Sequence, residues 1–338
     1  MSGPGDGAED ASGSVDPDDA AGTVTWRELL SDAADTLRRA AAEWVRSEPD
    51  RNALTEKDDA GSDGAVDAGS DGAVDAARIV AEAAGCSDAE LFMLLDEPAT
   101  VRGVAHLDAM LRRRIAGEPL QYVIGHWPFR YLDLMVDRRV LIPRPETEQV
   151  AEVALGELDR MGGRDRATTV VDLGTGSGAI ALAVATERVR TSVWATDLNQ
   201  DALDVARANL AGTGRAGARV RMVQGAWFEA LPDTLARSVD LIVSNPPYVA
   251  TTAQLSRSVT DWEPSDALFS GPDGLSDLRT LIAGAPLWLC DHGVLVCELS
   301  PEQGSTVLDL ARERFEEAEL APDLTGRDRT LVARRPHR

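Results

Sequence analysis

Val170-Val171-Asp172-Leu173-Gly174-Thr175-Gly176-Ser177-Gly178 is the stretch that sets the architecture of this chain. A β-branched run gives way to three alternate glycines, and an alanine-rich apolar run, residues 179–184, follows at once. This order predicts a buried strand, a tight turn and a helix, because glycine lets the backbone turn sharply and lets a ligand approach. The Gly-x-Gly-x-Gly spacing is shorter than the dinucleotide fingerprint, and no Lys-Ser or Lys-Thr follows as a phosphate loop requires. Nicotinamide and nucleoside triphosphate ligands are therefore disfavoured.

The next two predicted strands also end in residues that suit a nucleoside. Residues 192–196 lead to Asp197, whose carboxylate can accept hydrogen bonds from both hydroxyls of a ribose. Asp197 could instead cap the helix that begins near Asn199, and we favour ribose binding because the glycine turn is present. Residues 220–224 lead to Trp227, which we expect to cover an adenine ring; packing in the core or on the surface is the alternative.

Asn245-Pro246-Pro247-Tyr248 follows the apolar run of residues 239–243. Each proline fixes its own φ and pushes the preceding residue toward an extended conformation. The side-chain carbonyl of Asn245 and a free backbone carbonyl can then accept both hydrogens of an amino group, while the Tyr248 ring lies against its face. A plain Asn-Pro turn that ends a strand is the alternative. Beside a ribose site, the motif predicts transfer of a methyl group from S-adenosylmethionine to nitrogen.

An ordered set of motifs carries a resemblance to a known family. The motifs are Leu141-Ile142-Pro143-Arg144-Pro145-Glu146-Thr147-Glu148, the glycine turn, Gly225-x-Trp227-Phe228, Asn245 to Tyr248, Trp262-Glu263-Pro264 and Gly271-Pro272-Asp273-Gly274-Leu275. With them, from about Trp26 to Val332, the chain resembles the peptide chain release factor N(5)-glutamine methyltransferases, also called PrmC or HemK. The segment from Leu141 to Glu148 matches the release-factor enzymes rather than those that methylate a ribosomal-protein glutamine.

The resemblance implies a fold and a set of site residues. The fold is an α/β, seven-stranded SAM-dependent methyltransferase (Rossmann-like) domain with its last strand antiparallel, preceded by a small helical-bundle domain and a β-hairpin linker. The substrate is the glutamine in the Gly-Gly-Gln motif of class 1 peptide chain release factors. S-adenosyl-L-methionine, which becomes S-adenosyl-L-homocysteine, is bound by Gly174, Thr175, Gly176, Ser177, Gly178, Asp197, Trp227 and Asn245. The glutamine is held by Asn245, Pro246, Pro247 and Tyr248, of which Asn245, Pro246 and Tyr248 are expected to be catalytic. Arg144 could orient a loop or a carboxylate, but an arginine more commonly faces solvent, so we expect it to face solvent and leave it out of the catalytic residues.

Composition limits the possible partners. The chain has 338 residues, 43% of them hydrophobic, which is enough for two domains with a core. Its formal net charge of −23 argues against a nucleic-acid surface, because phosphate contacts need clustered basic residues. We find no secretory segment and no apolar run of about 18 residues, and so expect a cytoplasmic protein with no membrane contact. Separately, we expect a monomer.

Cysteine and histidine usage predicts a reduced compartment and no metal. The three cysteines have no Cys-x-x-Cys spacing, and none of the four histidines has a partner at metal-ligand spacing. These residues are Cys86, Cys290, Cys297, His106, His126, His292 and His337.

The expected domains follow one another along the chain. Residues 1–22 read as a disordered acidic tail, 23–118 as a helical substrate-recognition domain, 119–145 as the hairpin linker and 146–338 as the methyltransferase domain. An exact repeat, residues 59–66 and 67–74, marks an acidic Gly/Asp/Ala insertion at about 56–75, which we interpret as a solvated linker rather than a calcium loop. The family resemblance gives the helical domain a role in recognising the release factor; from composition alone it could equally be a dimerisation module.

Periodicity and capping residues place the smaller elements. Helices are predicted from Trp26 to near Pro49, and over residues 76–84, 87–96 and 104–116, with capping boxes at Thr25/Glu28 and Ser87/Glu90. Residues 121–140 are predicted to form the hairpin, around Asp137-Arg138. Strands at 239–244, 294–299 and 330–333 and helices at 275–289 and 303–315 complete the sheet. Tyr131 and Ser300 depart from the family pattern and put local packing in doubt.

Three other functions are alternatives to methylation of a release factor. A nucleic-acid adenine-N6 methyltransferase uses a similar Asn-Pro-Pro-Tyr grip, because adenine also presents a planar amino group, but it needs a basic groove that we do not find. Methylation of a glutamine in another protein, such as a ribosomal protein, is the nearer alternative. A binding protein that kept the fold without activity is the third, and the intact Gly174 to Gly178, Asp197 and Asn245 to Tyr248 argue against it.

Overall fold

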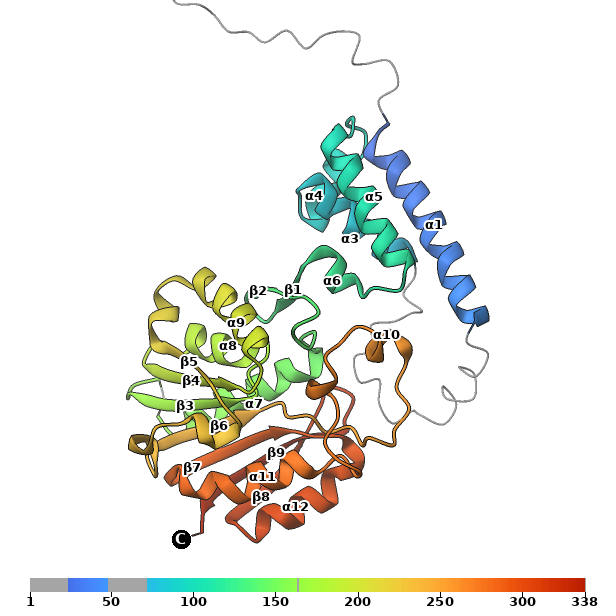
Figure 1. The fold of residues 1–338 in the computed structure, drawn as a ribbon. Coiled ribbons are helices and arrows are strands. Elements are labelled where there is room, and N and C mark those ends of the chain that lie inside the picture. The colour runs from blue at the N-terminus through green and yellow to red at the C-terminus, as the bar shows by residue number, and fades with distance from the viewer. Residues whose placement is uncertain (1–23, 48–71, 163, 338) are drawn as a thin grey trace, which may run out of the picture.

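The computed structural model describes residues 24–47, 72–162 and 164–337, which form a helical part and an α/β part (Figure 1). The predicted acidic tail lies outside the described residues. So does most of the predicted insertion, although its last residues, 72–75, belong to a helix. None of the described helices is both long and apolar enough to cross a membrane.

The helical part consists of α1 (Trp26–Ser47), α3 (Gly72–Ala84), α4 (Asp88–Leu94) and α5 (Val101–Ile115). Both predicted capping boxes form: the Glu28 carboxylate accepts the Thr25 N–H at 2.9 Å, and α4 carries the Ser87/Glu90 box. Helix α5 begins at Val101 rather than Val104, because the Thr100 hydroxyl accepts the N–H of Gly103 at 3.0 Å and caps it. The core of this part is built from Leu37, Ile79, Leu107 and Met110.

The predicted hairpin is shorter than expected, and its first residues are helical. Residues Leu120–Ile124 form α6, which ends at Gly125 with φ 86°. Only β1 (His126–Phe129) and β2 (Leu132–Met135) pair, so the turn lies at residues 130–131 and not at Asp137-Arg138. The prediction was wrong because a run of five residues that are mostly apolar fits a short helix and a strand equally well. Tyr131 is exposed at the tip of this turn.

The seven-stranded sheet is confirmed. Its strands are β3 (Thr168–Leu173), β4 (Thr191–Asp197), β5 (Val220–Gln224), β6 (Val239–Ser244), β7 (Leu289–Glu298), β8 (Phe315–Pro322) and β9 (Asp328–Pro336). They are arranged in the order β5-β4-β3-β6-β7-β9-β8, and the last strand, β9, runs antiparallel to both its neighbours, as predicted. Strand β8 was not identified from the sequence, because an edge strand with five acidic or small residues carries little apolar signal.

Helices cover both faces of the sheet (Figure 1). Helices α7 (Pro145–Arg160) and α8 (Ala179–Glu187) pack on the face reached by Val170 and Leu241. Helices α11 (Ser276–Gly284) and α12 (Gly304–Arg312) pack on the face reached by Val171 and Ile242. Neighbouring residues of one strand thus enter opposite cores, as the pleat of a strand requires. Helices α11 and α12 are shorter than the predicted 275–289 and 303–315.

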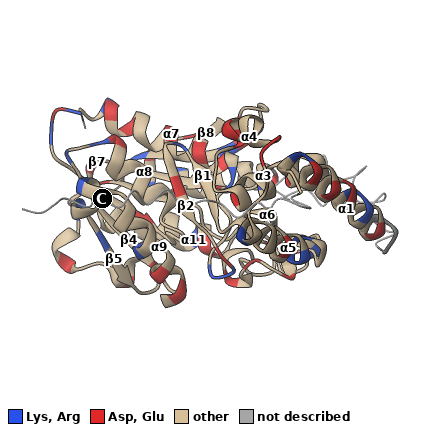
Figure 2. Ribbon diagram, turned by 90° about the horizontal axis from the view of Figure 1, so that it is seen from above, with Lys and Arg blue, Asp and Glu red and all other residues tan. Residues whose placement is uncertain are grey.

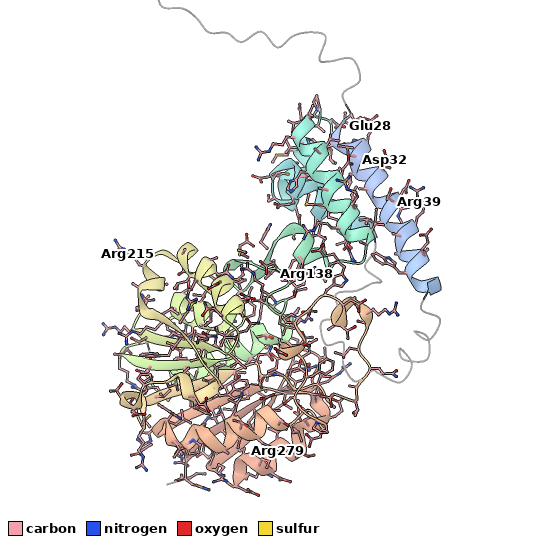
Figure 3. The ribbon with its side chains drawn as sticks, in the orientation of Figure 1. Glu28, Asp32, Arg39, Arg138, Arg215 and Arg279 are labelled. Atoms are coloured by element: carbon pink, nitrogen blue, oxygen red, sulfur yellow. The ribbon has the colours of Figure 1, made fainter. Side chains whose placement is uncertain are left out.

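A long loop after β6 joins the two parts of the molecule. It contains α10 (Arg257–Thr260), which lies between the helical and the α/β parts (Figure 1). The Trp262 ring packs with the buried Tyr122 and Ile142, and the Arg138 guanidinium lies 4.8 Å from the centre of that ring. Arg138 is labelled at this junction in Figure 3. The loop therefore ties the chain around α6 to the edge of the sheet where the parallel strands end.

A glycine in α5 offers a test of how tightly the helical part is packed. A Cβ at Gly103 would lie 2.6 Å from the Trp26 ring, so we expect Gly103→Ala to lower the free energy of unfolding by about 1–3 kcal/mol. The matched control is Gly156→Ala in α7, where a Cβ meets nothing within 4 Å and should raise that free energy by up to about 1 kcal/mol. Chemical denaturation of both variants measures the difference. Equal stabilities would contradict the packing.

Candidate active site

Two cavities meet at the carboxyl ends of the parallel strands. The larger, about 540 Å³, is bordered by the glycine turn after β3, by Asp197 after β4 and by Trp227 after β5. The smaller, about 60 Å³, is bordered by Pro246 and Tyr248. Asn245 lines both. The structure thus brings the glycine turn and the Asn-Pro-Pro-Tyr loop, which are about 70 residues apart in the sequence, to one place, as the edge of an open α/β sheet does.

The glycine turn borders the larger cavity with four of its five residues. Gly174, Gly176 and Gly178 have φ of 71°, 55° and 86°, in the left-handed region that favours glycine. A Cβ at Gly174 would lie 3.2 Å from the Trp227 ring, so this ring covers the turn closely. Gly178 does not line the cavity: a Cβ there would meet the side chains of Leu182 and Ala206 instead. Its place is at the start of α8, where it allows that helix to pack closely.

Asp197 is tied to the glycine turn. One carboxylate oxygen accepts the Gly176 N–H at 2.9 Å, and the other accepts the Asn199 N–H at 2.9 Å. Each oxygen keeps a second lone pair for a ligand hydroxyl. The cap of α9 (Gln200–Gly212) is Asn199, whose side chain accepts the Asp201 N–H, so the alternative role of Asp197 as the helix cap is wrong. Burial raises the pKa of the Asp197 carboxyl above its ordinary value.

Asp172 is a second acidic residue of the larger cavity that sequence analysis did not assign. It is 1% exposed, and its Oδ2 accepts the Thr175 hydroxyl at 2.6 Å and the Ala181 N–H at 3.1 Å. Its Oδ1 is buried and has no hydrogen-bond partner among the described residues. Burial raises the pKa of this carboxyl to about 7. The unpaired oxygen suits a ligand that brings a hydrogen-bond donor or a positive charge.

The loop at the end of β6 is held by its neighbours. The Ser244 hydroxyl donates to the Leu173 carbonyl at 2.6 Å, which joins the ends of β6 and β3. The Asn245 amide nitrogen donates to the Thr147 hydroxyl oxygen at 3.0 Å. Within the described residues, neither the Asn245 side-chain oxygen nor the Pro246 carbonyl accepts a hydrogen bond. Two acceptors are therefore available to a ligand at this loop.

A buried glutamate lies behind this loop. Glu298, the last residue of β7, accepts the Thr147 hydroxyl at 2.7 Å and the Tyr248 hydroxyl at 3.3 Å. Sequence analysis missed both Thr147 and Glu298. A signal existed for Glu298, because it ends an apolar strand as Asp197 does. No local pattern distinguishes Thr147, which lies in the first turn of α7.

Arg144 does not face solvent, and that expectation is wrong. The residue is 8% exposed, and its guanidinium donates to the Glu263 carboxylate at 2.6 Å. The other oxygen of Glu263 accepts the Ile142 N–H at 3.1 Å. This pair fastens the loop after α10 beside the site, where Pro264, Asp266 and Ala267 border the larger cavity. Arg144 is buried because that loop, distant in sequence, supplies its partner.

No cluster of three or more His, Cys, Asp or Glu residues that could hold a metal ion occurs in the described ranges. Trp227 has φ 45° and begins a 3-10 turn (Trp227–Ala230), so its ring position depends on an uncommon backbone conformation.

Comparison with known proteins places both parts of the chain. Residues 67–125 match the family model of the PrmC N-terminal domain, and residues 151–261 match that of the methyltransferase small domain. A release factor glutamine methyltransferase of Xylella fastidiosa (strain 9a5c) is 42% identical over 260 residues, which are 76% of this chain and 91% of that protein.

Two further relatives carry the same name. The protein from Neisseria gonorrhoeae is 42% identical, over 67% of this chain and 80% of its own length. The protein from Moorella thermoacetica is 40% identical, over 75% of this chain and 88% of its own length. Among solved structures, the hMettl16 catalytic domain is 13% identical over 68% of this chain and 81% of that chain, with a TM-score of 0.47.

Asp172 gives the stability of the protein a distinctive pH dependence. Its folded-state pKa of about 7 exceeds the ordinary 3.8, so between these values the folded chain holds a proton that the unfolded chain has lost. Its contribution to stability is therefore full below pH 4 and is lost as pH rises to 7. Asp172→Asn removes this titration. The free energy of unfolding of this variant minus that of the parent protein should therefore rise by about 1 kcal/mol per pH unit from pH 5 to 7.

The control for this measurement is Asp273→Asn. The hydrogen bonds from Arg279 lower the pKa of Asp273, so this carboxylate is ionised in both states above pH 5, and its variant should show no such rise. Chemical denaturation at several pH values makes the comparison. If the difference in the free energy of unfolding between Asp172→Asn and the parent does not change with pH, the assignment of Asp172 as an unpaired, buried carboxyl is contradicted.

Proposed function

The chain belongs to the release factor glutamine methyltransferase family, and we propose that it methylates the side-chain amide nitrogen of the glutamine in the Gly-Gly-Gln motif of class 1 release factors. The methyl donor of such enzymes is S-adenosylmethionine. The observation that supports this proposal best is the position of Asn245 in the wall shared by the two cavities, because an amide acceptor and a methyl donor can then meet at one side chain.

The larger cavity suits the donor. Asp197 has lone pairs free for the hydroxyls of a ribose, and the Trp227 ring offers a flat face beside the glycine turn. The donor supplies a methyl group on a positively charged sulfur and also carries an ammonium group. The buried Asp172 has one unpaired oxygen, which can accept a hydrogen bond from that ammonium group, and the ionised form of this carboxyl carries a complementary negative charge in the same cavity. The residues present therefore fit the donor.

The smaller cavity suits the glutamine side chain. Asn245 Oδ1 and the Pro246 carbonyl can accept the two hydrogens of the acceptor amide, and the Tyr248 ring can lie against its plane. This grip aims the nitrogen toward the larger cavity. Membership of the family implies that this glutamine belongs to a Gly-Gly-Gln motif, and a glutamine with no side chain on its two preceding residues can bring its amide into so narrow a space.

The main contribution of the protein to the reaction is to align the reacting atoms. An amide nitrogen is a poor nucleophile, so Asn245 and Pro246 must hold it in line with the methyl carbon and the sulfur, at roughly 3–3.5 Å. The nitrogen lone pair forms the N–C bond, the C–S electron pair stays on sulfur, and one amide proton leaves to solvent. The two accepting oxygens stabilise the positive charge that grows on nitrogen, which is larger in the transition state than before it.

We propose that the helical part, with residues 23–118 as its domain, recognises the release factor. We also propose that the enzyme acts as a cytoplasmic monomer. Its PrmC N-terminal family match supports a role particular to this family. Acidic and basic residues are interspersed over the described ribbon (Figure 2), and the net charge of −23 disfavours a nucleic acid as acceptor.

Mass spectrometry tests this proposal. Release factor incubated with enzyme and S-adenosylmethionine should gain the mass of one CH2 unit, located on the glutamine of its Gly-Gly-Gln motif. A release factor with that glutamine replaced by alanine is the negative control, and a ribosomal-protein fraction and duplex DNA serve as competing acceptors. Methylation of either of the last two, with the release factor unmodified, would overturn the assignment.

Asn245 should be needed for turnover more than for donor binding. Asn245→Ala removes one of two acceptors at the reacting nitrogen, so we expect kcat to fall by about 10²–10³. The dissociation constant of the donor, measured by calorimetry, should change far less, because Asp197 and the glycine turn are untouched. The converse variant, Trp227→Ala, should weaken donor binding first. Near-normal methylation by Asn245→Ala would contradict the role of this side chain.

A further inference from the structure

A buried relay of hydrogen bonds runs behind the acceptor site. It starts at Glu298, which is 1% exposed, passes through the hydroxyl of Thr147, which is 4% exposed, and ends at the Asn245 amide nitrogen. The three residues come from the end of β7, the start of α7 and the loop after β6. Neither Thr147 nor Glu298 is needed by the methyl transfer just described.

The direction of each hydrogen bond in this relay follows from the chemistry of its members. A carboxylate only accepts, so Thr147 must give its single hydroxyl hydrogen to Glu298. The Thr147 oxygen is then left with lone pairs alone toward Asn245, and only the NH2 end of the Asn245 amide can meet them. The two ends of an amide have almost the same shape, so its partners decide which way it faces. The Asn245 carbonyl oxygen is thereby turned away from Thr147.

Glu298 orders the other side of the acceptor site as well. Its second oxygen accepts the Tyr248 hydroxyl at 3.3 Å, so one carboxylate anchors both the amide and the ring of the Asn-Pro-Pro-Tyr loop. The Tyr248 hydroxyl bonds to Glu298 directly and the Asn245 amide bonds to it through Thr147, so neither group can reorient without leaving a polar atom unpaired.

This orientation distinguishes an amide from a carboxylate in the acceptor. A glutamine presents two N–H groups to the Asn245 carbonyl oxygen and the Pro246 carbonyl. A glutamate presents only oxygen lone pairs, which would face that carbonyl with the Glu298 negative charge behind it. If the Asn245 amide were reversed, its NH2 group would instead donate hydrogen bonds to a carboxylate.

We propose that Thr147 and Glu298 are positioning residues that lock the Asn245 amide with its carbonyl toward the acceptor, and so make the site select glutamine over glutamate. This inference rests on the proposed function. It adds to it a physical origin of acceptor selectivity that lies in the layer of residues behind the loop.

The decisive variant is Glu298→Gln. It keeps the size of the side chain, but its NH2 group can donate to the Thr147 oxygen while its carbonyl still accepts from Tyr248. The Thr147 hydrogen is then free to meet the Asn245 carbonyl, and the amide can reverse. We expect kcat to fall about tenfold or more, with the donor dissociation constant unchanged within about twofold.

The distinguishing measurement is competition between acceptors. A release factor with Glu in place of the target Gln should inhibit the parent enzyme with an inhibition constant at least about tenfold above the KM of the release factor that carries Gln, because a partner with two N–H groups is replaced by repulsive oxygens. With Glu298→Gln this preference should shrink or reverse. A residue of merely structural importance would lower activity without changing which acceptor is preferred.

Threonine variants separate the hydroxyl from the packing. Thr147→Val keeps the shape and loses the hydrogen bond, so it should show the same fall in kcat as Glu298→Gln. Thr147→Ser keeps the hydroxyl and should retain most of the activity. The matched control is Thr168→Val, a buried threonine that exchanges a 2.8 Å hydrogen bond with Thr191 at the opposite end of β3 and should keep normal kinetics.

The outcomes are distinguishable. If the parent enzyme methylates no glutamine at all, the proposed function fails. If it does so, but Thr147→Val and Glu298→Gln keep parental kcat, or lose it with the Gln-over-Glu preference unchanged, the inference of an orienting relay is overturned.

Discussion

The wall that Asn245 forms between two cavities is the constraint on which the rest of this structure depends. Two prolines stiffen the chain on one side of it, and on the other the hydrogen bond from Ser244 to the Leu173 carbonyl fastens β6 to β3. The position of a short side chain relative to the glycine turn is thus set by backbone that is itself part of the sheet. A methyl transfer that relies on alignment rather than on a base needs this kind of rigidity.

A second layer of residues orients the side chain that forms this wall. Glu298 and Thr147 reach the loop from a neighbouring strand and from the first turn of α7, and they fix hydrogen-bond directions that a rigid backbone leaves open. The Arg144–Glu263 pair fastens the loop after α10 in the same region. Two buried pairs that each join distant segments would be costly to break, because removing one partner leaves a polar group buried alone. The site and its surroundings therefore form one unit with the ends of the parallel strands.

The strand–turn–helix at Val170 predicted an α/β sheet, because the glycines and the apolar runs are local signals. The number of strands and the antiparallel last strand came from the family resemblance that the ordered motifs carry. The shortfalls lie where a local signal is weak or shared. Residues 120–124 satisfy both helical and strand periodicity, and β8 is an edge strand with little apolar character. Asp197 was given two possible roles, and the helix cap proved to be Asn199.

The residue types at the carboxyl ends of the strands, Asp172, Asp197 and Asn245, are determined by the sequence alone, and with them the kind of chemistry to expect. Only the tertiary structure decided that Arg144 is buried rather than solvated, and that Thr147 and Glu298 stand behind Asn245. Arg144 lies 119 residues from its partner Glu263, Thr147 lies 151 residues from Glu298, and Asn245 lies 98 residues from Thr147. A hydrogen bond depends on the distance and direction between two atoms, and sequence patterns carry that information only between neighbours along a helix or strand.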